Sequence, residues 1–105
     1  MEKVTDCLEY LISTDDEYGE LRGRVKGLEH RLKVAKAEAF LEAEGKGTQG
    51  QKESLAYTSE VYRQKLEEYE NAVVEMETIA AKRKTRELTI EVWRSQNANK
   101  RSGNI

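Results

Sequence analysis

The sequence predicts an all-α fold, a long antiparallel helical hairpin that resembles a coiled coil and assembles with other copies into a bundle. The chain of 105 residues contains no proline, and 36% of its residues are charged, as is typical of long helices with much exposed surface. Apolar residues recur at alternating steps of three and four in both halves, which is the pattern of a coiled-coil seam. A glycine-rich segment separates the halves, and the length suits a single domain over residues 1–105.

The first half carries two apolar stripes with a polar segment between them. The short stripe comprises Val4, Leu8 and Leu11, and the long one comprises Tyr18, Leu21, Val25, Leu28, Leu32, Ala35 and Ala39. Thr14 and Glu17 have the spacing of a capping box, the reciprocal side-chain arrangement that starts a helix. We therefore expect a short helix over about 2–12, a break or kink near 12–15, and a long helix over about 15–44.

The segment over residues 45–50 is the predicted turn of the hairpin. Gly45 suits the left-handed residue that ends a helix. Thr48 and Gln51 again have capping-box spacing, so the second long helix should begin here.

The second half is predicted to be helical over about 51–97, followed by a frayed tail over 98–105. Its seam comprises Tyr62, Leu66, Tyr69, Val73, Met76 and Ala80. Leu88, Ile90 and Val92 alternate with other residues as in a strand, but no turn precedes them, so we expect the helix to continue.

The two seams contain several tyrosines and alanines, and two helices alone bury little apolar surface. The sequence therefore predicts a homo-oligomer. Gly19, Gly23 and Gly27 recur every four residues, which would let another helix approach closely or form a ligand groove. Alternatively, these glycines are tolerated on an exposed face. The predicted oligomer interface comprises Tyr18, Gly19, Gly23, Val25, Gly27, Leu28, Leu32, Tyr62, Leu66, Tyr69, Val73 and Met76.

Several classes of function are disfavoured. No apolar run approaches the ~20 residues that a transmembrane helix needs, and the first residues are too polar for a signal peptide. The single cysteine, Cys7, excludes an intrachain disulfide, so we expect a cytoplasmic protein that does not bind membranes. The turn glycines match a dinucleotide fingerprint, but a predicted helix precedes them where a strand is required. We predict no catalytic residues, no metal and no cofactor.

The basic C-terminal end is the predicted binding site for a partner. Residues 82–105 carry seven basic and two acidic side chains, a net charge of +5, whereas residues 1–81 have a net charge of -7. Basic groups beside an aromatic ring are typical of proteins that bind single-stranded nucleic acid, so single-stranded DNA or a protein could bind here. Alternatively, the basic residues pair with acids of the first half and Trp93 anchors an interface. The predicted site comprises Lys82, Arg83, Lys84, Arg86, Trp93, Arg94, Lys100 and Arg101.

Two segments resemble a group of small helical proteins of tailed bacteriophages, whose genes lie among replication and recombination genes. They are the run Lys36–Leu41 and the ending from Ala81–Lys84 through Glu87–Arg94 to Asn97–Asn99. The resemblance implies a role in phage DNA metabolism in the cytoplasm of a bacterial host. It identifies no site residues.

Three classes of function follow. The leading hypothesis is a non-enzymatic phage accessory protein of DNA recombination or replication, which binds a protein complex or single-stranded DNA through its basic end. A second is a counter-defence inhibitor or sponge that binds a host defence component through its oligomer surface or a groove beside the three glycines. A third is a structural coiled-coil adaptor.

Overall fold

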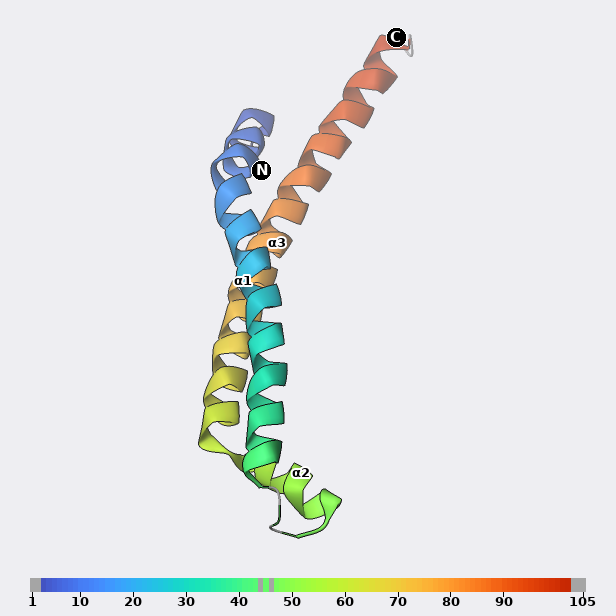
Figure 1. Ribbon diagram of the computed structural model, residues 1–105. Coiled ribbons are helices and arrows are strands. Elements are labelled where there is room, and N and C mark those ends of the chain that lie inside the picture. Colours follow the sequence, from blue (N-terminus) through green and yellow to red (C-terminus); the bar gives the residue numbers. More distant parts are fainter. Residues whose placement is uncertain (1–2, 44, 46, 103–105) are drawn as a thin grey trace. The chain divides into compact units, whose positions relative to one another are not determined.

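The fold is an all-α helical hairpin, as predicted. A computed structural model describes residues 3–43, 45 and 47–102, and these form three helices and no strand. Helix α1 spans Val4–Glu42, α2 spans Gln49–Thr58 and α3 spans Glu60–Arg101 (Figure 1). The segment around Leu88–Val92 lies within α3, which confirms its helical assignment over the strand alternative.

The described residues form two compact units. The terminal unit comprises the start of α1, as far as Glu20, and the last part of α3, from Glu77. The tip unit comprises Leu21–Met76, which includes α2 and the turn. Helices α1 and α3 each contribute to both units, whereas the sequence suggested one continuous hairpin domain.

The seam of the tip unit packs within one chain. Val25, Leu28 and Ala72 are buried, and Tyr69, Val73 and Met76 pack against them. Apolar residues spaced by three and four lie on one face of a helix, so α1 and α3 meet along this stripe. Five of the residues predicted for an oligomer interface therefore have partners in the same chain: Val25, Leu28, Tyr69, Val73 and Met76. Leu32 and Leu66 of the same seam are half-buried.

The turn has the predicted chemistry. Gly45 has a φ of 84°, the left-handed conformation that glycine adopts without strain. The hydroxyl of Thr48 accepts a hydrogen bond from the Gln51 amide, and the Gln51 side chain accepts one from the Thr48 amide. The predicted capping box therefore starts α2.

A break at Ser59 divides the second half, although the sequence predicted one helix over 51–97. Ser59 has an extended backbone (ψ 143°) and ends α2 by donating its N–H to the Ala56 carbonyl. Its hydroxyl then accepts a hydrogen bond from the Tyr62 amide, which caps the start of α3. The rings of Tyr57 and Tyr62 pack edge to face across the break, with centroids 5.5 Å apart.

Helix α2 is also held to α1 by a polar contact. Lys36 donates a hydrogen bond to the Tyr57 hydroxyl, and its ammonium lies 4.2 Å from the centroid of the same ring. The hydrogen bond with Tyr57 raises the pKa of Lys36 above its ordinary value. Both contacts favour the charged form of the lysine.

Two predicted helix boundaries are wrong. Residues 12–15 lie inside α1, so there is no separate helix over 2–12; the Thr14 hydroxyl bonds back to the Tyr10 carbonyl rather than capping a new helix. The sequence predicted a frayed tail from residue 98, but residues 98–101 belong to α3. The positive charges of Lys100 and Arg101 suit this C-terminal turn because they oppose the negative end of the helix dipole. Residues 103–105 of that tail, and residue 44 of the predicted first long helix, lie outside the described residues.

The three helical glycines lie on an open face of α1. A Cβ atom added at Gly19, Gly23 or Gly27 would meet no atom within 4 Å beyond the local helix. Within the described part of the chain, the glycines therefore support no close helix crossing.

Replacing these glycines with alanine should stabilise the protein. We expect Gly23→Ala to raise the free energy of unfolding by about 1 kcal/mol, and all three replacements by about 3 kcal/mol, because alanine favours the helix and meets no obstacle. Urea unfolding followed by circular dichroism measures this change. Gly47→Ala is the contrasting variant: it should destabilise the turn, because Gly47 has a φ of 132° and a Cβ there would collide with the Gln51 side chain. Destabilisation by Gly23→Ala would show that another chain packs on the glycine face.

Candidate partner-binding surface

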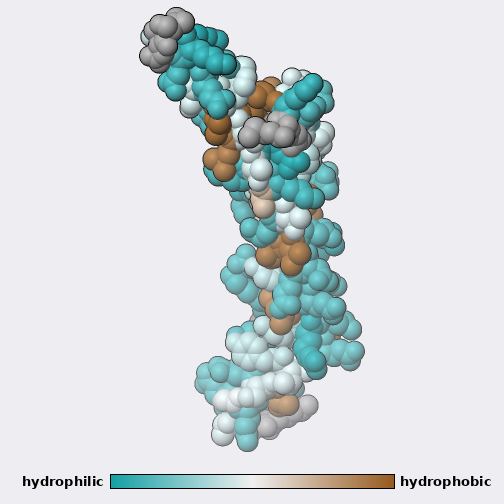
Figure 2. Space-filling model, turned by 180° about the vertical axis from the view of Figure 1, so that it is seen from behind, coloured by the Kyte–Doolittle hydropathy of each residue, from teal (hydrophilic) through white to brown (hydrophobic). Residues whose placement is uncertain are grey.

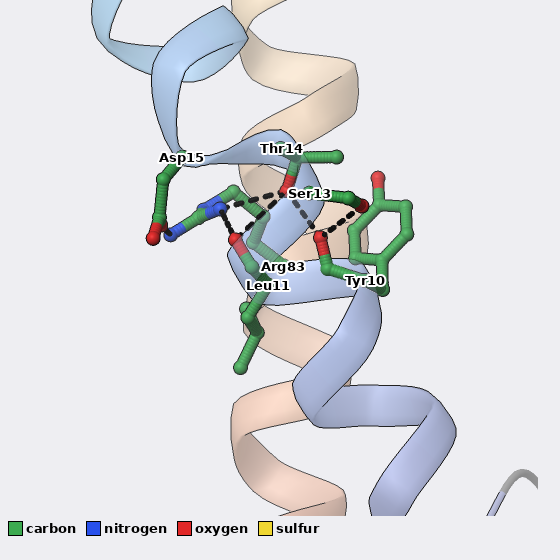
Figure 3. Close-up of polar contacts among 6 residues, drawn as sticks. All are labelled: Tyr10, Leu11, Ser13, Thr14, Asp15 and Arg83. Atoms are coloured by element: carbon green, nitrogen blue, oxygen red, sulfur yellow. Dashed lines mark hydrogen bonds and ion pairs between the residues drawn. The ribbon is translucent and has the colours of Figure 1, made fainter.

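A partly buried arginine joins the two helices of the terminal unit (Figure 3). Arg83 on α3 donates hydrogen bonds from Nη1 to the Leu11 carbonyl (2.8 Å) and the Thr14 hydroxyl (2.7 Å). Its Nη2 donates to Oδ1 of Asp15 at 2.7 Å, forming an ion pair. The Arg83 side chain is only 15% exposed, whereas that of Asp15 is 60% exposed. Arg83 is therefore bound to one turn of α1.

Two aromatic rings of α1 lie against two arginines of α3, Arg83 and Arg86. The guanidinium carbon of Arg83 lies 5.1 Å from the centroid of the Tyr18 ring. The guanidinium carbon of Arg86 lies 4.2 Å from the Tyr10 ring centroid, and its Nη1 donates to the Lys82 carbonyl. Such cation–π contacts are each worth about 0.5–2 kcal/mol, depending on desolvation. Tyr18, predicted for an oligomer interface, thus has a contact within its own chain.

The predicted basic site separates into two groups. Arg83 and Arg86 are both engaged with α1: Arg83 pairs with an acid of the first half, Asp15, as in the alternative interpretation, whereas Arg86 lies against the Tyr10 ring. Arg94 forms an exposed ion pair with Glu91 at 3.3 Å, a type of contact that contributes little to stability. The other members are exposed along α3: Lys82, Lys84, Trp93, Lys100 and Arg101.

A groove lies between the first turn of α1 and the last part of α3. Its volume is about 620 Å³. On the face shown in Figure 2, hydrophobic surface is visible at this end of the molecule and again in patches along its middle. We call this feature the terminal groove; it is lined by Lys3, Val4, Thr5, Thr89, Val92, Trp93 and Gln96. Val92 and Trp93 are about half exposed, so the groove offers apolar contact area.

The groove side of α3 is basic. Lys82 and Lys100 lie eleven residues before and seven residues after Trp93, spacings that put all three on one side of a helix with 3.6 residues per turn. Glu87, in contrast, lines a second hollow on another side of α3, together with Lys84, Arg83 and Tyr18. The terminal groove therefore has three apolar lining residues, Val4, Val92 and Trp93, and exposed lysines on the same side of α3.

Neither a group of metal-ligating side chains nor a membrane-spanning helix is found among the described residues. Among them, no group of three or more histidine, cysteine, aspartate or glutamate residues is placed to hold a metal ion. None of the helices in this part of the chain has an apolar stretch that could cross a bilayer. Comparison with known protein families, with curated proteins and with solved structures found no match.

Sequence reasoning missed the contribution of α1 to this surface. Thr14 was assigned to a helix start, although its place beside the Val4–Leu11 stripe also fits a seam position. Continuing the α3 seam by three residues from Ala80 reaches Arg83, so the heptad pattern itself could have identified the arginine as facing α1. The groove combines residues from both ends of the described chain, and local sequence patterns do not show that these residues meet.

Removing the Arg83 contacts should weaken the terminal unit. We expect Arg83→Met to lower the free energy of unfolding by about 2 kcal/mol, because charge-assisted hydrogen bonds contribute more than neutral ones. The matched control Lys84→Met changes an exposed neighbour and should alter stability by less than about 0.5 kcal/mol. Urea unfolding of both variants provides the comparison. Equal effects would mean that the Arg83 hydrogen bonds contribute nothing net to folding.

Proposed function

We propose that this protein is a non-enzymatic binding protein that docks onto a protein partner through the terminal groove. The observation that carries the proposal is the joint placement of Trp93, Val92 and Val4 in one groove beside exposed lysines. Half-exposed apolar side chains next to positive charge suit a partner segment that is both apolar and acidic. The resemblance to small phage proteins supports a role in phage DNA recombination or replication in a bacterial host.

A protein partner is favoured over single-stranded DNA. Arg83 and Arg86 are engaged with α1, which reduces the positive charge available for phosphates. The groove offers one aromatic ring, Trp93, together with aliphatic Val4 and Val92. Proteins that bind single strands combine a continuous basic path with several stacking rings. The terminal groove instead resembles an apolar site with a charged edge.

Capture of partners from infected cells tests the proposal. We expect the wild-type chain to retain a protein partner after nuclease treatment. Reversing two lysines on the groove side, in Lys82→Glu/Lys100→Glu, should reduce capture by roughly tenfold, because it replaces attraction of an acidic partner by repulsion. Lys84→Glu is the matched control, because Lys84 lies on the other side of α3, and it should leave capture unchanged.

Two results would contradict the proposal. Equal capture by all three proteins would place the binding surface elsewhere. Loss of capture on nuclease treatment, together with a salt-dependent gel shift of oligo(dT) by the wild-type chain, would assign the surface to single-stranded DNA.

A further inference from the structure

The start of α1 has the chemistry that the terminal groove should bind. Residues 4–20 contain six acidic residues and no basic residue. Leu8 and Ile12, one helical turn apart, are 46% and 72% exposed. Glu9 and Asp16 lie three residues before and four residues after Ile12, so they share its side of the helix. This segment is therefore an acidic helix with an exposed apolar edge.

The two helical segments of the terminal unit have opposite charge. Residues 77–101 of α3 carry seven basic and three acidic residues, a net charge of +4, against the -6 of residues 4–20. Within one chain, Arg83 and Asp15 form an ion pair between these two segments. Lys82 and Lys100 remain at the surface on the groove side of α3, and Glu9 and Asp16 remain at the surface of α1. Each chain therefore displays both an acidic and a basic surface in this unit.

The terminal unit also buries little apolar surface by itself. The side chains that are buried in its described part are Cys7 and Thr14. Five large hydrophobic side chains of the same unit are close to half exposed or more: Leu8, Ile12, Leu88, Val92 and Trp93. In a pair of helices, each helix buries one apolar stripe. In a bundle of four helices, each helix can bury a second apolar stripe against another neighbour.

We infer that the occupant of the terminal groove is a second copy of this chain. The inference rests on the proposed function, because it names the partner for the same groove. In the dimer, Leu8 and Ile12 of each copy pack against Val92 and Trp93 of the other. The acidic side of α1 faces the groove-side lysines of the partner copy. A two-fold axis repeats this contact, so the acidic helix of each copy lies in the terminal groove of the other.

Charge reversal in two complementary variants tests the inference. Light scattering should show a wild-type mass of two 12.1 kDa chains. Glu9→Lys/Asp16→Lys and Lys82→Glu/Lys100→Glu should each weaken dimerisation by tenfold or more, since either change juxtaposes like charges. Mixing the two variants should restore the dimer, because each then meets an opposite charge in both contacts. Restoration also shows that neither variant is misfolded.

The only tryptophan of the chain gives a second measurement. Burial of Trp93 in the dimer should shift its fluorescence emission to shorter wavelength, and dilution should reverse the shift. Lys84→Glu is again the control and should change neither mass nor emission.

The outcomes separate this inference from the proposed function. A wild-type chain that stays monomeric but captures another protein through groove-side lysines would overturn the inference and leave the proposed function standing. A dimer whose mass neither charge reversal changes would also overturn it. Failure of both the dimer and the lysine-dependent capture would remove both proposals.

Discussion

The terminal unit depends on one constraint, the burial of a charged arginine between two helices. A guanidinium taken out of water costs several kcal/mol unless its donors are satisfied. The acceptors for Arg83 lie on a single turn of α1: the Leu11 carbonyl, the Thr14 hydroxyl and the Asp15 carboxylate. Sliding α3 by one turn would move Arg83 away from all three of these acceptors. Arg83 therefore fixes the register in which the start of α1 meets α3.

The contacts with α1 also separate the basic residues that are engaged within the chain from those that remain exposed for binding. Arg83 and Arg86 hold the helices together, whereas Lys82 and Lys100 stay exposed beside the groove. The basic residues of α3 look alike in the sequence, but some of them hold the helices together and others are exposed. Their positions around the helix decide which role each one has. The apolar contact area comes from Val92 and Trp93 of α3 together with Val4, which lies near the other end of the chain. The candidate surface consequently exists only when the first turn of α1 and the last part of α3 are brought together.

The regular features of the fold were predictable from the sequence, and the irregular ones were not. Heptad spacing identified Val25, Leu28 and Met76 as seam residues, and Gly45 with Thr48 identified the turn. The break at Ser59 was missed because no glycine or proline marks it; a serine cap and the packing of two tyrosine rings create it. Thr14 was misassigned because its spacing to Glu17 satisfies a capping pattern, whereas its environment is set by Arg83, 69 residues away. Heptad spacing places Arg83 on the seam of α3, but it does not identify the acceptors that the arginine meets on α1.

The sequence distance between partners has a consequence for how the chain folds. Lys36 and Tyr57 in the tip unit are 21 residues apart, whereas Arg83 and Asp15 are 68 residues apart. The entropic cost of closing a loop rises with its length, so contacts near the turn should form first and shorten the loop that later contacts must close. Folding would then proceed like a zipper from the turn toward the two ends. During synthesis, the start of α1 can therefore bind Arg83 only after most of the chain has left the ribosome.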